Sequence, residues 1–166
     1  MNKALNLVPI ALLAACSQAE SPVPEATETE VSAAAEPALD EAQDGSQFPP
    51  AEQVADIRLE RVSFADAARS KSVEGSIQGY QSVDYVINVK TGQAMNISMA
   101  TPNTAAYFNL IEPGETEVAI FVGSTSGNMY EGIAQKSGDY RVRVYMMRSA
   151  ARREEKANYR LEFNLG

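Results

Sequence analysis

The chain has 166 residues, of which 22 are acidic, 14 are basic and none is histidine, so its formal net charge is −8. A chain this acidic lacks the basic face with which proteins bind nucleic acids. Without histidine it also lacks the commonest general base and the commonest metal ligand. The single cysteine excludes an internal disulfide, a thiolate metal cluster and Cys–His catalysis. The composition therefore predicts a protein with no cofactor, no bound metal and no nucleic-acid partner.

Residues 1–15 have the pattern of a secretory signal, with Lys3 followed by an apolar run of about a dozen residues. A membrane-spanning helix needs roughly 20. The run ends in Leu13-Ala14-Ala15-Cys16, which resembles the lipobox of bacterial lipoproteins. The resemblance implies that Cys16 is lipidated and attaches the protein to a membrane, the alternative being a plain signal peptide with a chance cysteine. Ser17 stands where an Asp would favour the inner membrane, so we expect the periplasmic leaflet of a Gram-negative outer membrane.

Residues 16–50 are predicted to form a disordered tether. From Ser17 to Pro50 there are eight acidic residues, five prolines and no Lys or Arg. Such a segment cannot bury enough apolar area to offset its ordering entropy, and its like charges keep it extended. We interpret it as a spacer that holds a domain away from the membrane, because nothing else in the sequence favours an acidic binding tail.

Residues 51–166 have the pattern of a single β domain. Apolar residues alternate with polar ones or form short runs at 57–64, 73–77, 80–89, 95–99, 106–111, 118–122, 129–134, 140–145 and 159–165. Turn residues such as those of Lys90–Gln93 and Glu112–Gly114 separate these segments. The pattern predicts an all-β fold, an antiparallel two-sheet β-sandwich of about 8–9 strands.

Three local expectations accompany this fold. The continuous apolar run Val118–Val122 is expected to be a buried strand, and Gly123–Gly127 a flexible turn after it. Helical pieces are expected at Phe64–Ser70 and around Ser149–Glu154. The second of these would be a structured loop at one end of the sandwich, where binding residues tend to lie.

The residues of this domain do not predict an enzyme. There is no Gly-rich phosphate loop between a strand and a helix, and no Gly-x-Ser-x-Gly element with triad partners. Acidic pairs such as Glu115 with Glu117 lie in segments that read as exposed loops. The basic residues are more informative, because eight of the 13 in the domain lie in residues 136–166. Arg148 and Arg152 share a face if their loop is helical, whereas Arg141 and Arg143 are expected on a solvated strand surface.

The stretch Tyr140–Arg153, followed by Ala157–Tyr159, resembles the periplasmic inhibitor of g-type lysozyme. The same family is matched, in the same order, by Gly79-Tyr80, Lys90–Gln93 and Ser137–Tyr140. The match spans roughly residues 57–166, and the Arg-x-x-x-Arg element after Val-Arg-Val-Tyr is its most specific part. The resemblance implies a β-sandwich that plugs the substrate cleft of a lysozyme without chemistry of its own.

The resemblance also implies a set of lysozyme-binding residues. They comprise two tyrosines, a Ser-Gly pair and two arginines, namely Tyr80, Ser137, Gly138, Tyr140, Arg148 and Arg152. Ser126–Tyr130 is a competing copy of the Ser-Gly-x-Tyr element, and which of the two loops makes contact stays open. Guanidinium groups suit a cleft that carries carboxylates, because they form charge-assisted and bidentate hydrogen bonds.

The first hypothesis is therefore a lipid-anchored periplasmic inhibitor of g-type lysozyme. The alternative is a non-inhibitory envelope-binding module for glycan or protein, in which Tyr80, Tyr85 and Tyr130 serve as stacking platforms and peptidoglycan is a partner. The charge balance is compatible with an acidic target, because the acidity lies in the tether. The tether carries −8, whereas the domain has 13 basic and 14 acidic residues and so a charge of −1.

Overall fold

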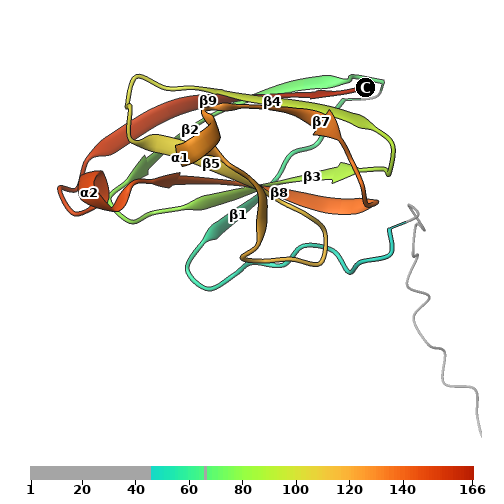
Figure 1. Cartoon of the computed structure of the whole chain (residues 1–166), viewed down its shortest axis with the longest axis horizontal. Coiled ribbons are helices and arrows are strands. Elements are labelled where there is room, and N and C mark those ends of the chain that lie inside the picture. Colours follow the sequence, from blue (N-terminus) through green and yellow to red (C-terminus); the bar gives the residue numbers. More distant parts are fainter. Residues whose placement is uncertain (1–45, 66) are drawn as a thin grey trace, which may run out of the picture. The chain divides into compact units, whose positions relative to one another are not determined.

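The computed structural model describes residues 46–65 and 67–166, which form nine strands and two single-turn helices (Figure 1). In chain order the strands are β1 Arg58–Arg61, β2 Ser70–Gln78, β3 Val83–Val89, β4 Ala94–Ala100, β5 Ala106–Ile111, β6 Ala119–Val122, β7 Met129–Ile133, β8 Gly138–Met146 and β9 Lys156–Leu165. The helices are α1 Gly123–Ser126 and α2 Arg148–Ala151, and within the described residues no helix is long and apolar enough to span a membrane. The predicted all-β fold is confirmed. The predicted signal peptide, Cys16 and most of the predicted tether lie outside the described residues.

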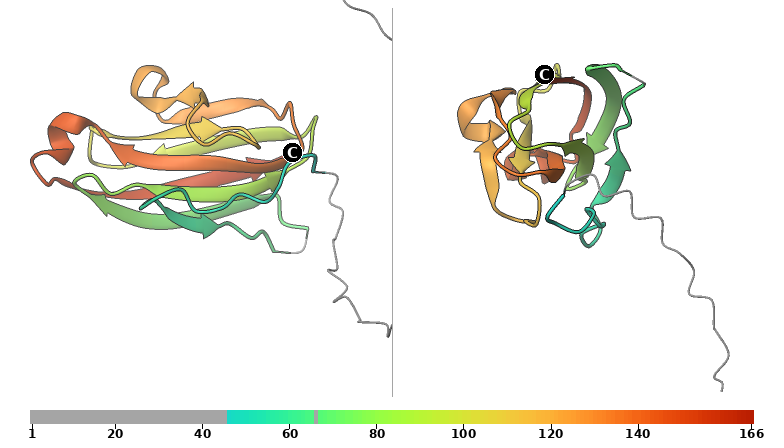
Figure 2. Two further views of the ribbon diagram at one scale, coloured as in Figure 1. Left: turned by 90° about the horizontal axis from the view of Figure 1, so that it is seen from below. Right: turned by 90° about the vertical axis from the view of Figure 1, so that its right-hand side faces the viewer.

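The strands form two sheets that face each other (Figure 2). One has five strands in the order β1-β3-β8-β5-β6, and the other has four in the order β2-β9-β4-β7. Neighbouring strands are antiparallel except β1 and β3, which are parallel. The expectation of wholly antiparallel sheets is wrong at this pair. The reason is that β2 crosses to the other sheet, so the chain re-enters the first sheet in its original direction.

The core lies between the two sheets and follows the alternation seen in the sequence. In β9 every second residue from Ala157 to Leu165 is buried, and the residues between them are exposed or half-buried. Each large side chain removed from water in this way contributes about 1.5–3 kcal/mol. In β3 every residue except Asn88 is buried, so this strand is covered on both faces.

A buried charge cluster lies on the outer face of the five-stranded sheet. Asp84 of β3 accepts two hydrogen bonds from Arg143 of β8, at 2.7 Å from Nε and 2.9 Å from Nη2. Arg141 Nη1 adds a third at 3.3 Å, and both Asp84 and Arg141 are buried. The hydrogen bond from Arg143 to Asp84 raises the pKa of this guanidinium. The two arginines, Arg141 buried and Arg143 half-buried, are therefore partners of one buried carboxylate, and the expectation of a solvated strand surface is wrong for them.

Two local expectations also differ from the structure. No helix forms in the described part of 64–70, where Ala67 has a φ of +61°, a value that helical residues do not adopt. Within the apolar run Val118–Val122, residues Ala119–Val122 form β6, which is an edge strand with exposed side chains at Ile120 and Val122. The predicted helical turn near Ser149 is confirmed as α2, and α1 occupies the segment expected to be a flexible turn.

Candidate functional site

The structure divides the six predicted lysozyme-binding residues between the two ends of the sandwich. Arg148 and Arg152 lie in and directly after α2, and Tyr80 follows β2, whose last residue Gln78 pairs with Lys156 at the start of β9. We call this end of the sandwich, which carries α2, the arginine pole (Figure 1). Ser137 and Gly138 lie at the other end, which we call the serine pole. β8 runs from one pole to the other, and its nine residues span about 26 Å at the usual rise of a strand. The six residues therefore do not form one site.

The arginine pole is built on α2. The first turn is held by the amide of Met147, which donates to the carbonyl of Ala105 at 2.9 Å. Ala150 and Ala151 are buried, and this fixes the opposite side of the turn to the core. Arg148 and Arg152 are exposed, and the amide of Arg152 donates to the carbonyl of Arg148 at 3.0 Å. The predicted shared face of these two arginines is thus present as a single helical turn.

The two guanidinium groups of this face are available to a partner. With the other described residues, neither Arg148 nor Arg152 forms an ion pair or a side-chain hydrogen bond. The neighbouring Arg153 behaves differently, because its Nε donates to Glu155 at 2.8 Å. This hydrogen bond holds the pKa of the Glu155 carboxyl below its ordinary value. An anionic group can therefore bind Arg148 and Arg152 without first displacing an internal carboxylate.

Tyr80 is joined to the arginine pole through the turn that precedes it. Its side chain is 65% exposed. The preceding residue, Gly79, has a φ of +57° and donates its amide to the carbonyl of Glu155 at 3.0 Å. A Cβ at Gly79 would lie only 2.4 Å from Oε2 of Glu154. The turn that carries Tyr80 therefore packs directly against the loop that follows α2.

Asn103, in the connection between β4 and β5, makes a second polar contact with the loop that follows α2. Nδ2 of Asn103 donates to Oε2 of Glu155 at 3.3 Å and to the carbonyl of Lys156 at 3.4 Å. Oδ1 of Asn103 accepts a hydrogen bond from the amide of Ala105 at 2.8 Å. Asn103 therefore links the start of β9 to Ala105, the residue whose carbonyl accepts the hydrogen bond from Met147 before α2.

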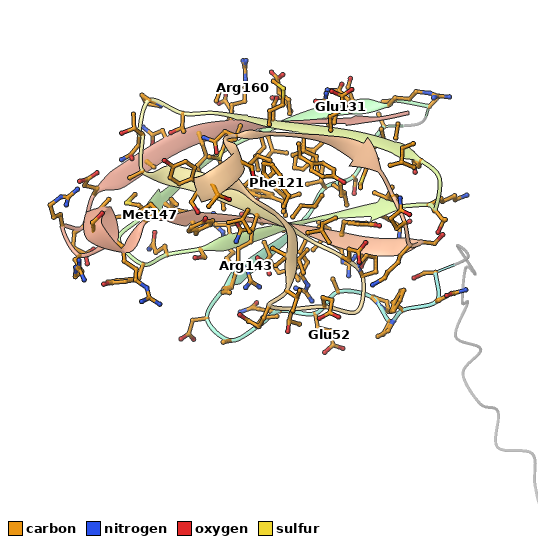
Figure 3. All side chains as sticks on the ribbon, viewed as in Figure 1. Glu52, Phe121, Glu131, Arg143, Met147 and Arg160 are labelled. Atoms are coloured by element: carbon orange, nitrogen blue, oxygen red, sulfur yellow. The ribbon has the colours of Figure 1, made fainter. Side chains whose placement is uncertain are left out.

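Met147 is a further candidate that the sequence argument did not single out. Its side chain is 41% exposed next to Arg148, and Figure 3 shows it beside α2. Tyr80 and Met147 are the large apolar side chains exposed at this end among the described residues. An apolar centre with a charged surround is the usual composition of a protein interface. The signal available in the sequence was an apolar residue, Met147, between the end of β8 and Arg148.

The serine pole does not present the predicted tyrosine. Tyr140 is 0% exposed, and its hydroxyl bonds to both the amide and the carbonyl of Lys136 at 3.2 Å. Burial raises the pKa of this phenol. A surface role for the Tyr140 side chain is therefore wrong, because alternation along β8 directs it into the core. Tyr85, considered as a stacking platform, is buried in the same core.

Ser137 and Gly138 are engaged within the domain. Oγ of Ser137 accepts a hydrogen bond from the amide of Thr91 at 2.9 Å. Gly138 is buried with a φ of +138°, a value that strains other residues. In the competing loop, Tyr130 is half-buried and its ring packs edge-on against Phe121, with centroids 5.5 Å apart. No group of three or more potential metal ligands occurs among residues 46–65 and 67–166.

Comparison with known proteins identifies relatives among solved structures. No family model matches the chain, and no curated protein sequence does. The chain is similar to the crystal structure of Aeromonas hydrophila PliG, a periplasmic lysozyme inhibitor of g-type lysozyme. That match has a TM-score of 0.62 and 31% sequence identity, and it covers 67% of this chain and 98% of that chain.

Two further PliG structures have the same fold. Salmonella Typhimurium PliG aligns with a TM-score of 0.52 and 22% identity, covering 66% of this chain and 98% of that chain. A mutant of Escherichia coli PliG aligns with a TM-score of 0.50 and 24% identity, covering 68% and 100%. The fold, the almost complete coverage and the identity to the Aeromonas protein agree with the resemblance read from the Arg148–Arg152 segment. The chain therefore belongs to the PliG family, the periplasmic lysozyme inhibitors of g-type lysozyme.

Proposed function

We propose that this protein is a lipid-anchored periplasmic inhibitor of g-type lysozyme, which binds the enzyme through its arginine pole. The observation that carries the proposal is the placement of Tyr80, Arg148 and Arg152 at one end, exposed, within a member of the PliG family. The inhibitor blocks the substrate cleft by occupying it and performs no chemistry of its own.

The side chains of the arginine pole suit a cleft that works with carboxylates. Glycoside hydrolases typically place two Asp or Glu side chains about the scissile bond. A guanidinium that enters such a cleft forms short, charge-assisted hydrogen bonds, which are bidentate when the geometry allows. Because Arg148 and Arg152 have no described carboxylate partner, this pairing breaks no internal ion pair. Tyr80 and Met147 would supply the apolar contact, and Tyr and Arg are frequent anchors of interfaces.

The lipid anchor is proposed from the sequence around Cys16. Cleavage before this residue and acylation of it would attach the domain to the periplasmic leaflet of the outer membrane. Metabolic labelling with radioactive palmitate tests the anchor directly. We expect label in the native chain and none in Cys16→Ser, and we expect that variant in the soluble periplasmic fraction. Label retained in Cys16→Ser would contradict the anchor and would leave the inhibitor proposal intact.

A turbidity assay with g-type, c-type and i-type lysozymes tests the inhibition. We expect the protein to suppress lysis by the g-type enzyme. Arg148→Ala or Arg152→Ala should each weaken binding by about 2–5 kcal/mol if the pair is buried in the complex. Arg160→Ala is the matched control, because this exposed arginine lies on the four-stranded sheet away from α2 (Figure 3).

Undiminished lysis by the g-type enzyme at a saturating concentration of the protein would overturn the proposal. Equal losses in Arg160→Ala and Arg148→Ala would instead remove the assignment of the arginine pole. Retention on purified peptidoglycan without inhibition would favour the envelope-binding alternative.

A further inference from the structure

The first described residues of the chain are fastened to the serine pole. Oγ of Ser46 donates to the carbonyl of Phe48 at 2.9 Å and lies 3.4 Å from the carbonyl of Ser137, so the contact with Ser137 is the longer of the two. Gly138 makes room for this contact, because a Cβ there would lie 2.7 Å from the same Oγ and 3.0 Å from Pro113. The Ser-Gly pair at the start of β8 therefore receives a segment that is about 90 residues distant in sequence.

Phe48 fills the next position along this segment. A Cβ at Gly114 would lie 2.6 Å from Cδ1 and 2.9 Å from Cε1 of its ring, so the ring packs closely against the backbone of the loop after β5. Nζ of Lys136 lies 5.5 Å from the ring centroid and pairs with Glu112 at 2.9 Å. The hydrogen bond that Lys136 donates to Glu112 raises the pKa of the lysine, and the same contact holds the ammonium group beside the aromatic ring.

Ala51 completes the attachment through a nearly buried carboxylate. Its amide donates to Oδ2 of Asp139 at 2.8 Å, and the side chain of Asp139 is only 7% exposed. Arg61 binds both partners, because its Nη1 lies 2.7 Å from the same carboxylate and its Nη2 donates to the carbonyl of Ala51 at 2.8 Å. Asn88 donates to the other oxygen of Asp139 at 3.1 Å. The segment is thus one of three partners that satisfy this carboxylate.

We propose that the serine pole is a docking site for the chain's own segment Ser46–Ala51, and that this contact makes the anchoring extension leave the domain opposite the arginine pole. The inference rests on the proposed lipid anchor and inhibitor function. It assigns Ser137, Gly138 and Asp139 to holding this segment, and not to lysozyme. Figures 1 and 2 both show the first described residues at the end remote from α2.

The exit point decides which end of the domain faces the membrane. Between Cys16 and Ser46 there are 29 residues, and the root-mean-square end-to-end distance of a Gly-rich linker of this length, about 30 Å, is a lower bound for a tether predicted to be extended by its like charges. This distance is comparable with the separation of about 26 Å between the poles. An anchored domain held at its serine pole therefore keeps that pole, on average, nearer the lipid attachment, and Tyr80, Arg148 and Arg152 lie at the farther end.

Fluorescence quenching on the lipidated full chain tests the orientation. Cys16 carries the lipid, so a single added cysteine accepts a fluorophore at either pole, in Lys90→Cys beside Ser137 or in Ser149→Cys on α2. Vesicles contain a lipid with a quencher on its headgroup. We expect quenching at position 90 to exceed that at position 149 by about twofold, because the poles are about 26 Å apart.

Release of the segment should abolish that difference. Ala51→Pro removes the amide hydrogen that Ala51 donates to Asp139, and Phe48→Ser removes the aromatic ring that packs against Gly114. We expect the double variant to show equal quenching at the two positions, whereas Gln47→Ala, an exposed neighbour, keeps the native difference. Equal quenching in the native chain, or stronger quenching at position 149, would overturn the proposal.

Hydrogen exchange of the full chain with excess g-type lysozyme separates this inference from the inhibitor function. We expect slower exchange around Tyr80 and 147–153, with residues 46–51 and 137–140 unchanged. Faster exchange at 46–51 together with slower exchange at 137–140 would mean that lysozyme displaces the segment, and would overturn the assignment. If lysozyme slows exchange nowhere, the inhibitor proposal fails, and the quenching experiment still decides the docking.

Discussion

The close packing between the two sheets depends on single residues, and Gly75 of β2 shows this most clearly. A Cβ there would lie 2.6 Å from the hydroxyl of Tyr159 and 2.7 Å from that of Tyr85. These two hydroxyls bond to each other at 3.0 Å between edge-on rings. Burial raises the pKa of both phenols, so both remain neutral hydrogen-bonding groups even in alkaline solution.

Gly75→Ala should therefore destabilise the domain by about 1–3 kcal/mol through overpacking. This loss exceeds the 0.5–1 kcal/mol or so that an alanine gains over glycine within a strand. Tyr159→Phe removes the nearest atom, so the double variant should lose less than the sum of the two single losses. Urea unfolding of the four proteins measures the coupling. A Gly75→Ala variant as stable as the native protein would contradict the packing argument.

Asp84 gives a second prediction at the residue scale. It is the carboxylate shared by Arg141 and Arg143, so Asp84→Ala leaves two guanidinium groups without their buried partner. We expect a loss of about 3–5 kcal/mol, the usual cost of breaking a buried ion pair from one side. Glu117→Gln is the control, because Glu117 lies 3.8 Å from Arg143 with a 76% exposed side chain. It should change the free energy of unfolding, measured in urea, by less than about 0.5 kcal/mol, and a comparable loss in both variants would contradict the assignment.

At the scale of the element, the sequence identified most strands but not which of them lie at an edge. The run Val118–Val122 reads as a buried strand because apolar content is a local property. Whether a strand has one neighbour or two depends on the sheet order, to which residues far along the chain contribute. β6 ends the five-stranded sheet without a charged residue, whereas the edge strands β1, β2 and β7 carry charges such as those of Arg58, Lys71 and Glu131.

This difference predicts that β6 is the edge at which copies of the domain associate at high concentration. Ile120 is 46% exposed, so Ile120→Lys should change the free energy of unfolding by less than about 0.5 kcal/mol. Light scattering as a function of protein concentration should show weaker association in this variant. Phe121→Lys is the matched contrast, since Phe121 packs on Phe108 at 5.1 Å between centroids and its replacement should prevent folding. Unchanged association in Ile120→Lys would contradict the role of this edge.

The chemistry of the candidate site was predictable from the sequence. The separation of its predicted residues between the two ends of the sandwich was not. The spacing of Arg148 and Arg152 gave their common face because it depends on one helical turn. The separation of Ser137 from these arginines follows once β8 is known to be one uninterrupted strand. What the sequence could not reveal is the occupant of the serine pole, because Ser46 and Phe48 lie in the stretch 16–50, whose composition predicts disorder. Five of those residues, 46–50, in fact lie against the domain.

At the scale of the whole molecule, the segment Ser46–Ala51 is joined to the rest of the domain at Asp139. Burial alone would raise the pKa of this carboxyl. The amide of Ala51, with Arg61 and Asn88, outweighs burial and holds the pKa below its ordinary value. A carboxyl with a lowered pKa in the folded state stabilises that state at neutral pH. The contribution is complete above the unfolded pKa of about 3.9 and is lost as the pH falls through the lower folded value.

The attachment of residues 46–51 should therefore be insensitive to pH between about 7 and 5 and should loosen only in stronger acid. The amide resonance of Ala51, followed by NMR in the full chain, should shift with a midpoint below about 3.9. In Asp139→Asn this titration should vanish, while the hydrogen bond from Ala51 to the amide oxygen persists in weaker form. A midpoint above the ordinary carboxyl value would mean that burial outweighs the three donors. It would also predict release of the segment in mild acid, where the native contact is expected to hold.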